Sequence, residues 1–353
     1  MKNKVTVFTT VYNGLPFLKE TIESILNQTY KDFDYLIIDD CSTDKSVQLI
    51  ESYDDPRIRL VKNKKNLGTA ETINKGLSII DSKYIVRLDH DDVSLSNRVE
   101  EQIRYLDNNP DIDIVCSWEH TIDHNGNKIR DWKTHISNYG DFLAPVLFGI
   151  CPIWHPSIAF KKNAMIKAGG FDASYTRAED FEVTARLALK RFNAAVVPKF
   201  LLLQREHDNR QSVQYNDIQR NITHKIQTNS LQYFINYELV SEFASFLRVD
   251  DITETKRNKI HLLEYSKMFE KLLEKVKTKQ NLTFEEMETF KNAFIKRLGY
   301  GIIYCQYFRF LPNILFNLCF TILSPLSNPT IREPISKLYN RVKSFSLKRK
   351  YIY

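Results

Sequence analysis

Hydrophobic and polar positions follow two alternating rhythms through the first half of the chain. Short runs rich in β-branched and aromatic residues, which favour strands, occupy residues 5–10, 35–38, 59–62, 84–88 and 112–118. Between them, apolar residues recur at helical spacing in residues 17–28, 69–80 and 95–106. Strand, helix, strand at this rhythm predicts parallel strands joined by right-handed crossovers. We therefore expect an α/β fold with a mostly parallel central sheet and helices on both faces.

The alternation stops at about residue 215, and residues 216–353 show a helical, basic and aromatic pattern instead. Residues 302–326 are rich in Ile, Leu, Phe and Tyr, but Arg309, Pro312 and Pro325 interrupt them. They fall short of the roughly 20 continuous apolar residues that a membrane-spanning helix needs. Two interpretations stay open for this segment, a helix lying on a membrane surface and a helical core packed on the first domain. We predict a domain of residues 1–215 followed by a helical extension.

Composition narrows the class of protein. An apolar content of 43% in 353 residues is typical of a globular chain with a sizeable core and excludes a disordered one. The five cysteines are scattered, without paired or metal-site spacing, which favours a reducing compartment. The first strand is too short to be the apolar part of a secretory signal. We therefore expect a cytoplasmic protein.

The net charge of +7 is unevenly spread, because from Arg332 onward seven basic residues accompany a single acid. Such a tail is either a solvated end or a contact with anionic lipid at the inner face of the cell membrane. It carries no nucleic-acid-binding motif. Peripheral membrane contact is therefore one of two interpretations of the tail, and nucleic acid is not an expected partner.

The strongest local signal is a run of acids directly after an apolar strand. Asp89, His90, Asp91 and Asp92 follow residues 84–88, and ligands of open α/β sheets bind beyond such strand ends. Three crowded carboxylates repel one another unless a cation neutralises them. Mn²⁺ and Mg²⁺ bind such oxygens together with substrate phosphates. The run predicts either a divalent metal site or an acidic cap before the helix at 95–106.

A second apolar strand also ends in paired acids, Asp39 and Asp40. A carboxylate in this place can accept a hydrogen bond from the imide N–H of uracil or from another base, which discriminates between bases. Ser42 and Asp44, just beyond, are typical helix caps. Capping by these two residues does not account for Asp39 and Asp40. We expect a nucleobase contact at this strand end.

The first strand ends in a polar turn, Thr10-Val11-Tyr12-Asn13-Gly14. Tyr12 offers a flat face to a nucleobase, while Thr10 and the turn backbone offer hydrogen bonds. An aromatic residue after a strand is more often part of the core. Taken alone, this turn decides little.

Two further motifs lie later in the chain. Glu179 and Asp180 open an amphipathic helical pattern that reaches residue 190. Acids in a first helical turn are favoured by the helix dipole, but one of them can also be a general base that takes the proton of a hydroxyl. Arg205-Glu206-His207 follows an apolar run. A lone histidine is more often a surface or core residue than a metal ligand.

In this order, the five motifs resemble those of the family 2 glycosyltransferases, whose fold is called GT-A. The resemblance covers residues 5 to about 212 and includes three other segments, Asn66-Leu67-Gly68, His155-Pro156-Ser157 and Gly169-Gly170-Phe171-Asp172. It implies a nucleotide-binding sandwich at about residues 1–115 and an acceptor side at about 116–215. It also implies an inverting transfer of a hexose from a nucleotide diphosphate donor, commonly a UDP-sugar. The implied acceptor is a hydroxyl of a glycan or glycolipid in surface polysaccharide synthesis.

Carried over position by position, the resemblance implies roles for individual residues. The donor nucleotide would be held, with Asp40 on the base, by Thr10, Val11, Tyr12, Asn13, Asp40, Asn66, Asp89 and His90. A divalent metal, Mn²⁺ or Mg²⁺, would be bound by Asp89, Asp91 and His207. Asp180 would be the catalytic base, with Glu179 beside it orienting the acceptor. The acceptor site would be lined by Trp154 and His155.

One position departs from the family pattern, because Ile73 stands where many members have an arginine near the diphosphate. Lys75, or one of the lysines at 62, 64 and 65, would then have to supply the charge. Two other functions stay open. A nucleotide-sugar-binding protein without transfer activity would have no need of a base such as Asp180. A nucleotidyltransferase would be expected to carry a glycine-rich basic loop early in the chain, which residues 10–16 are not.

Overall fold

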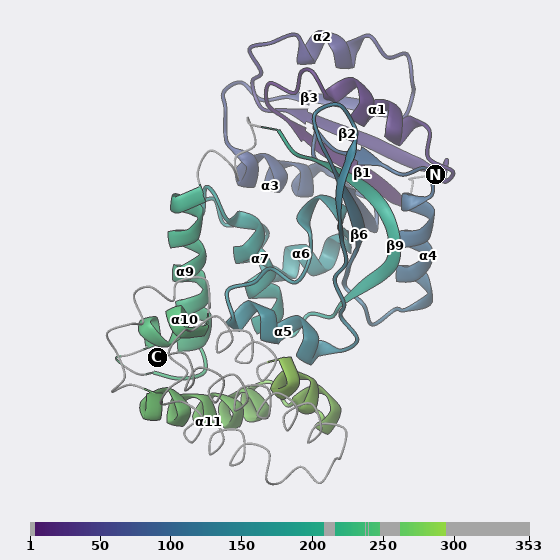
Figure 1. Cartoon of the computed structure of the whole chain (residues 1–353). Helices are drawn as coiled ribbons and strands as arrows, with labels where there is room; N and C mark the ends of the chain where they lie inside the picture. Colours follow the sequence, from purple (N-terminus) through teal and green to yellow (C-terminus); the bar gives the residue numbers. More distant parts are fainter. Residues whose placement is uncertain (1–3, 208–215, 237, 239, 248–261, 294–353) are drawn as a thin grey trace, which may run out of the picture. The chain divides into compact units, whose positions relative to one another are not determined.

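The computed structural model describes residues 4–207, 216–236, 238, 240–247 and 262–293 (Figure 1). The chain divides into two compact units, residues 1–230 and 231–353. The predicted domain boundary at residue 215, the apolar segment 302–326 and the basic tail from Arg332 lie outside the described residues. Within the described ranges, no helix combines the length and the apolar character that crossing a membrane requires.

A parallel sheet forms the first part of the first unit and confirms the predicted α/β architecture. β1 lies between β2 and β4, β3 pairs with β2, and all three pairings are parallel. β2 is buried at every residue except Asp34, as expected of a strand covered on both faces. The strands here are β1 (Val5–Val11), β2 (Phe33–Asp39), β3 (Ile58–Lys62) and β4 (Tyr84–Arg87). The helices that join them are α1 (Leu18–Leu26), α2 (Ser46–Glu51) and α3 (Thr69–Ile79).

The rest of the sheet is mixed, with antiparallel strands that the sequence pattern did not predict. β8 (Ala159–Lys161) lies antiparallel to both β4 and β6 (Ile114–Ile122). β9 (Ala194–Arg205) runs parallel to β6, and β5 (Val93–Ser94) runs antiparallel to the end of β9. Among the described residues the sheet has the order β3-β2-β1-β4-β8-β6-β9-β5. A hairpin adds β7 (Lys128–Trp132) to β6.

Helices cover both faces of the sheet, as predicted. On one face, α1 and α4 (Arg98–Asn108) share a buried cluster with alternate strand residues such as Val7 and Ile37. On the other, α3 packs so closely that a Cβ added to Gly76 would lie 2.3 Å from the Phe8 ring. Figure 1 shows α4 on one side of β6 and β9, with α6 and α7 on the other. The remaining elements of this unit are α5 (Tyr139–Leu147), the 3₁₀ turn η1 (His155–Ser157), α6 (Lys162–Ala168) and α7 (Glu179–Leu189).

Helices also make up the described residues of the second unit. α9 (Asn216–Gln232) spans the division between the units, and α10 (Val240–Leu247) and α11 (Leu262–Lys279) follow. Met268, Phe269, Leu272 and Val276 of α11 are buried. Their spacing of three and four residues places them on one helix face. The helical C-terminal region expected from the sequence is therefore confirmed for the described residues.

Three of the largest fully buried side chains are arginines, Arg87, Arg98 and Arg205. A buried guanidinium is costly unless acidic or carbonyl oxygens surround it. Arg87 ends β4, Arg98 begins α4 and Arg205 ends β9. The apolar core therefore ends in a charged layer near the carboxyl ends of β4 and β9, beside the acid run that follows β4.

Candidate active site

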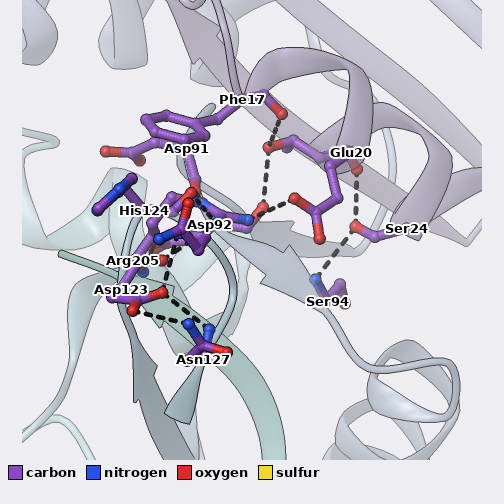
Figure 2. A network of polar contacts seen from close by, with 12 residues as sticks. Phe17, Glu20, Ser24, Asp91, Asp92, Ser94, Asp123, His124, Asn127 and Arg205 are labelled. Carbon is purple, nitrogen blue, oxygen red and sulfur yellow. Dashed lines mark hydrogen bonds and ion pairs between the residues drawn. The ribbon is translucent and has the colours of Figure 1, made fainter. Parts of the chain in front are cut away.

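Each acid of the run after β4 has its own partner. Asp89 Oδ1 accepts a hydrogen bond from Arg87 Nη2 at 2.7 Å. Asp92 Oδ1 accepts the backbone N–H of Arg205 at 2.9 Å, and Asp91 Oδ2 lies 3.0 Å from His207 Nε2. The three carboxylates therefore have three different partners, the guanidinium of Arg87, the backbone N–H of Arg205 and the imidazole of His207. Figure 2 shows Asp91 and Asp92 grouped around Arg205.

The proposed metal ligands divide into two groups. Asp91 and His207, which are 116 residues apart, face each other, whereas the Asp89 carboxylate is bound by Arg87. In the part of the chain that the structure describes, no cluster of three His, Cys, Asp or Glu side chains is placed to hold a metal ion. The structure thus brings together a carboxylate and an imidazole, and it places Asp89 to one side of them.

Glu179 and Asp180 form the first turn of α7 and share the environment of Asp89. Burial, and next the charge of Asp180, raise the pKa of Glu179 to about 7. Burial also raises the pKa of Asp180, and the negative charge of Asp89 acts in the same direction. The Asp180 carboxylate accepts the N–H of Phe181 at 2.7 Å, which favours its ionised form. Two carboxylates that hold protons more tightly than usual therefore lie within electrostatic reach of the acid run.

Arg87 joins several of the predicted site residues, although the sequence motifs did not point to it. Its guanidinium binds Asp89, reaches Thr10 Oγ1 at 3.4 Å, and acts electrostatically on His155 and Glu179. Its Nε is buried without a hydrogen-bond partner among the described residues. An arginine as the last residue of an otherwise apolar strand, two positions before an acid, was the signal in the sequence.

The turn after β1 leaves one aromatic ring exposed. Tyr12 is 46% exposed, while Val11 is buried. Asn13 has a φ of +51° and ties the turn to the next loop, because its Oδ1 accepts the N–H of Thr43 at 2.8 Å and its own N–H donates to Ser42 Oγ at 2.9 Å. His90 Nδ1 lies 3.3 Å from the carbonyl oxygen of Thr10. The predicted nucleotide-binding turn and the acid run are therefore adjacent.

Asp40 organises the loop that follows β3. Its Oδ1 accepts hydrogen bonds from Asn63 Nδ2 at 2.7 Å and from the N–H of Leu67 at 2.8 Å, and its Oδ2 accepts the N–H of Gly68 at 2.8 Å. Asn66 Oδ1 also accepts the Gly68 N–H, at 3.0 Å. These bonds place Asp40 and Asn66 in one loop. A contact between Asp40 and the nucleobase stays a prediction. Asp40 would have to accept a hydrogen bond from the nucleobase besides the three that it already accepts.

Ile73 is fully buried in α3, and Lys75, on the same helix, is part of the Asp40 network. Lys75 Nζ donates to Asn63 Oδ1 at 2.6 Å. Lys62, another candidate for the missing charge, pairs instead with Glu51 at 2.5 Å. Lys75 and the Asp40 carboxylate therefore share Asn63 as a hydrogen-bonding partner. Of these two lysines, Lys75 is the better placed to supply the charge that the family arginine would carry.

Asn74, on α3, binds the segment that precedes α7. Asn74 Nδ2 donates to the carbonyl of Phe171 at 2.7 Å, and Asn74 Oδ1 accepts the Phe171 N–H at 2.8 Å. Gly170 has a φ of +68°, and a Cβ there would lie 2.6 Å from Asn74 Oδ1. Asn74 and the Gly169-Gly170-Phe171-Asp172 segment are therefore joined, although Asn74 and Phe171 are 97 residues apart.

The predicted acceptor residues differ in exposure. His155 is buried, and burial lowers its pKa well below the usual value, with the charge of Arg87 adding to the effect. Its Nε2 has no hydrogen-bond partner within the described residues, and its ring meets Phe171 edge to face. Trp154 is half-buried, and its ring lies 5.2 Å from that of Trp132 on β7. Trp132 was not among the predicted acceptor residues, because the sequence pattern did not predict the β6–β7 hairpin.

Comparison of the amino-acid sequence with known proteins gives the same family that the sequence motifs resemble. Residues 6–170 match the model of the family described as glycosyl transferase family 2. An uncharacterised glycosyltransferase of Methanocaldococcus jannaschii is 35% identical over 208 residues, covering 58% of this chain and 71% of that protein. One of Haemophilus influenzae is 30% identical over 243 residues, covering 66% and 74%.

Solved structures share the fold at low sequence identity. The Staphylococcus aureus protein TarS, residues 1–349 in complex with UDP-GlcNAc, superposes with a TM-score of 0.55 at 14% identity, covering 100% of this chain and 93% of that one. The mannosyltransferase PcManGT of Pyrobaculum calidifontis, in complex with GDP-Man and Mn²⁺, gives 0.50 at 15% identity, covering 86% and 88%. Both comparisons confirm the GT-A fold.

Proposed function

Because this chain belongs to glycosyl transferase family 2, we propose that it moves a hexose from a nucleoside diphosphate sugar to a hydroxyl group of a glycan or glycolipid, with inversion at the anomeric carbon. The observation that carries this proposal is that Glu179 and Asp180, in the first turn of α7, lie within electrostatic reach of Asp89, which follows β4. This supports a catalytic base close to the residues that follow the donor-side strands.

In this proposal Asp180 takes the proton of the acceptor hydroxyl as its oxygen attacks the anomeric carbon. The bond from that carbon to the diphosphate oxygen breaks, and its electron pair leaves with the diphosphate. A carboxylate whose pKa is raised is a stronger base than an exposed one, and general-base catalysis contributes a factor of about 10²–10⁴ to the rate. Glu179 orients the acceptor beside it, and Trp154 offers a ring face to the acceptor sugar.

The residues fit a divalent cation in part. Asp91 and His207 present a carboxylate oxygen and an imidazole nitrogen to each other, and such a pair can bind Mn²⁺ or Mg²⁺ together with diphosphate and water oxygens. A metal bound there would act as a Lewis acid on the leaving diphosphate. Asp89 would contribute either by binding the ribose or, after breaking its hydrogen bond to Arg87, by binding the metal. Asp91 and His207 are therefore the ligands that we propose first.

We propose that the loops around Tyr12 and Asp40 bind the donor nucleotide. The exposed Tyr12 ring would stack on the base, while Thr10, Asn13, Asn66 and His90 belong to the surrounding loops. The fold neighbours are described as bound to UDP-GlcNAc and to GDP-Man, which supports a nucleoside diphosphate sugar as the donor class. We favour a UDP-sugar, and as acceptor a surface glycan on a lipid carrier assembled at the inner face of the membrane.

The experiment that tests the function is Asp180→Asn. We expect the transfer rate to fall by at least about 10²-fold while donor binding stays near that of the wild type, because only the base is lost. Candidate donors are found first, by screening nucleotide sugars for metal-dependent thermal stabilisation. Asp111→Asn, at an exposed aspartate, is the matched control. Normal turnover of Asp180→Asn would remove Asp180 from the role. Donor binding without product from the wild type would favour a binding protein instead.

A further inference from the structure

Arg205 is a buried charge with many partners beside the acid run. It is the last residue of β9, and its side chain is 2% exposed. Its Nε donates to the carbonyl of Asp91 at 3.2 Å, and its Nη1 lies 3.2 Å from the carbonyl of Asp123 and 3.4 Å from that of His124. Its Nη2 forms an ion pair with Glu20 of α1 (Figure 2). One guanidinium therefore joins four segments of the fold.

The backbone and ring contacts of Arg205 reinforce this junction. Its own N–H donates to Asp92 Oδ1 at 2.9 Å. The Phe17 ring packs on the guanidinium at 4.6 Å, and the same ring lies 5.0 Å from that of His207. The side-chain contacts of Arg205 thus reach the loop that carries Asp91 and, through Phe17, the ring of His207.

The loop around Asp91 is held on both sides. Thr21 Oγ1 lies 2.9 Å from the carbonyl oxygen of His90 and 2.8 Å from that of Asp92. Arg205 Nε donates to the Asp91 carbonyl between these two, so three consecutive carbonyls of the loop have a donor within reach, the outer two sharing the single Thr21 hydroxyl proton. Immediately after the acids, β5 pairs with residues 202–203 of β9, just before Arg205. His207 lies two residues beyond Arg205, so the same junction adjoins both members of the Asp91–His207 pair, whose atoms are 3.0 Å apart.

We propose that Arg205 is a positioning residue that fixes the acid loop and the His207 end of β9 in the mutual geometry needed to bind a divalent cation. The proposal rests on the function proposed above, in which Asp91 and His207 hold that cation. Arginine suits the position because its planar fork can direct several N–H groups at fixed angles toward separate oxygens. Lysine keeps the charge but cannot reproduce the fork, so it would leave at least one of the carbonyls without a donor.

Arg57 offers a matched control in the same unit. It makes the same kinds of contact, an ion pair with Asp55, a hydrogen bond to the carbonyl of Leu26 at 3.1 Å, and a ring contact with Phe33 at 4.9 Å. It immediately precedes β3, so it lies at the amino ends of the parallel strands. Loss of Arg57 removes contacts of the same kinds, made by a side chain that is 22% exposed, at the opposite ends of the strands from the acid run.

The test measures Mn²⁺ binding by the full chain without donor, from the electron paramagnetic resonance signal of free Mn²⁺. Loss of a residue that orients metal ligands typically weakens metal affinity by about 10- to 100-fold, and we expect that range for Arg205→Met and about tenfold for Arg205→Lys. Arg57→Met should leave the affinity unchanged. In turnover, Arg205→Lys should need more Mn²⁺ for half-maximal rate while keeping its rate at saturating Mn²⁺. An unchanged Mn²⁺ affinity in either folded Arg205 variant would overturn the proposal.

Hydrogen–deuterium exchange separates this inference from the proposed function. Amides of residues 89–95 should exchange faster in Arg205→Met, or in Arg205→Lys if the methionine variant does not fold, and not in Arg57→Met. If the wild type binds no Mn²⁺, the proposed metal site is wrong, and the exchange rates alone decide the role of Arg205. Unchanged exchange at residues 89–95 would then refute that role.

Discussion

Replacing Glu179 by Gln should stabilise the protein at high pH and change it little at low pH. Burial and the charge of Asp180 raise the pKa of Glu179 from 4.5 to about 7 in the folded protein. A raised pKa means that the folded state binds the proton more tightly than the unfolded chain. The stability that this proton contributes is complete below about pH 4.5 and is lost as the pH rises through about 7. Glutamine mimics the protonated form at every pH.

The magnitude follows from the two pKa values. Linkage gives a gain for Glu179→Gln of about 3 kcal/mol at pH 8.5 and less than about 1 kcal/mol at pH 5. Because Asp180 shares the burial and part of the repulsion, the pair titrates together, and we expect a measured gain of about 1–3 kcal/mol at the higher pH. The gain should come at the expense of transfer activity, since Glu179 orients the acceptor in the proposed mechanism.

The assay is urea unfolding followed by tryptophan fluorescence at both pH values. The chain has three tryptophans, Trp118, Trp132 and Trp154, and all of them lie in the first unit, so the signal reports the unit that carries the site. Glu71→Gln is the matched control, because Glu71 also lies in the first turn of a helix but is exposed. It should give equal effects at both pH values. A gain for Glu179→Gln that does not grow with pH would refute the reasoning.

Two further predictions concern the acid run and the packing of α3. Asp91→Ala should abolish the part of donor affinity that depends on Mn²⁺; equal affinities with and without Mn²⁺ in wild-type calorimetry would contradict the metal site. Gly76→Ala should destabilise the first unit by about 1–3 kcal/mol in urea unfolding, because its Cβ overlaps the Phe8 ring. Ser78→Ala, exposed on the same helix, is the control, and an equally small effect at both positions would show that the ring can move aside.

Local patterns in the sequence predicted the parallel half of the sheet. Each strand from β1 to β4 is a short apolar run followed by an amphipathic helix, so the periodicity of neighbouring residues is enough to identify it. β7 and β8 were not predicted, because β7 is exposed along its whole length and β8 has only three residues. Their antiparallel direction depends on which distant strand they pair with, which local periodicity does not encode.

The sequence by itself placed the acids at strand ends and, through their order, indicated the family. Tertiary structure decided what Asp91 and Asp92 bind, whereas the partner of Asp89, Arg87, lies only two residues away in the sequence. The Asp89 carboxylate binds Arg87, Asp92 accepts a hydrogen bond from Arg205, and Asp91 lies 3.0 Å from His207. Their neighbouring positions in the sequence do not predict these different partners. The reason is that the energy of a buried charge depends on the few oxygens and nitrogens within hydrogen-bonding distance. Most of those atoms come from residues far away in the chain.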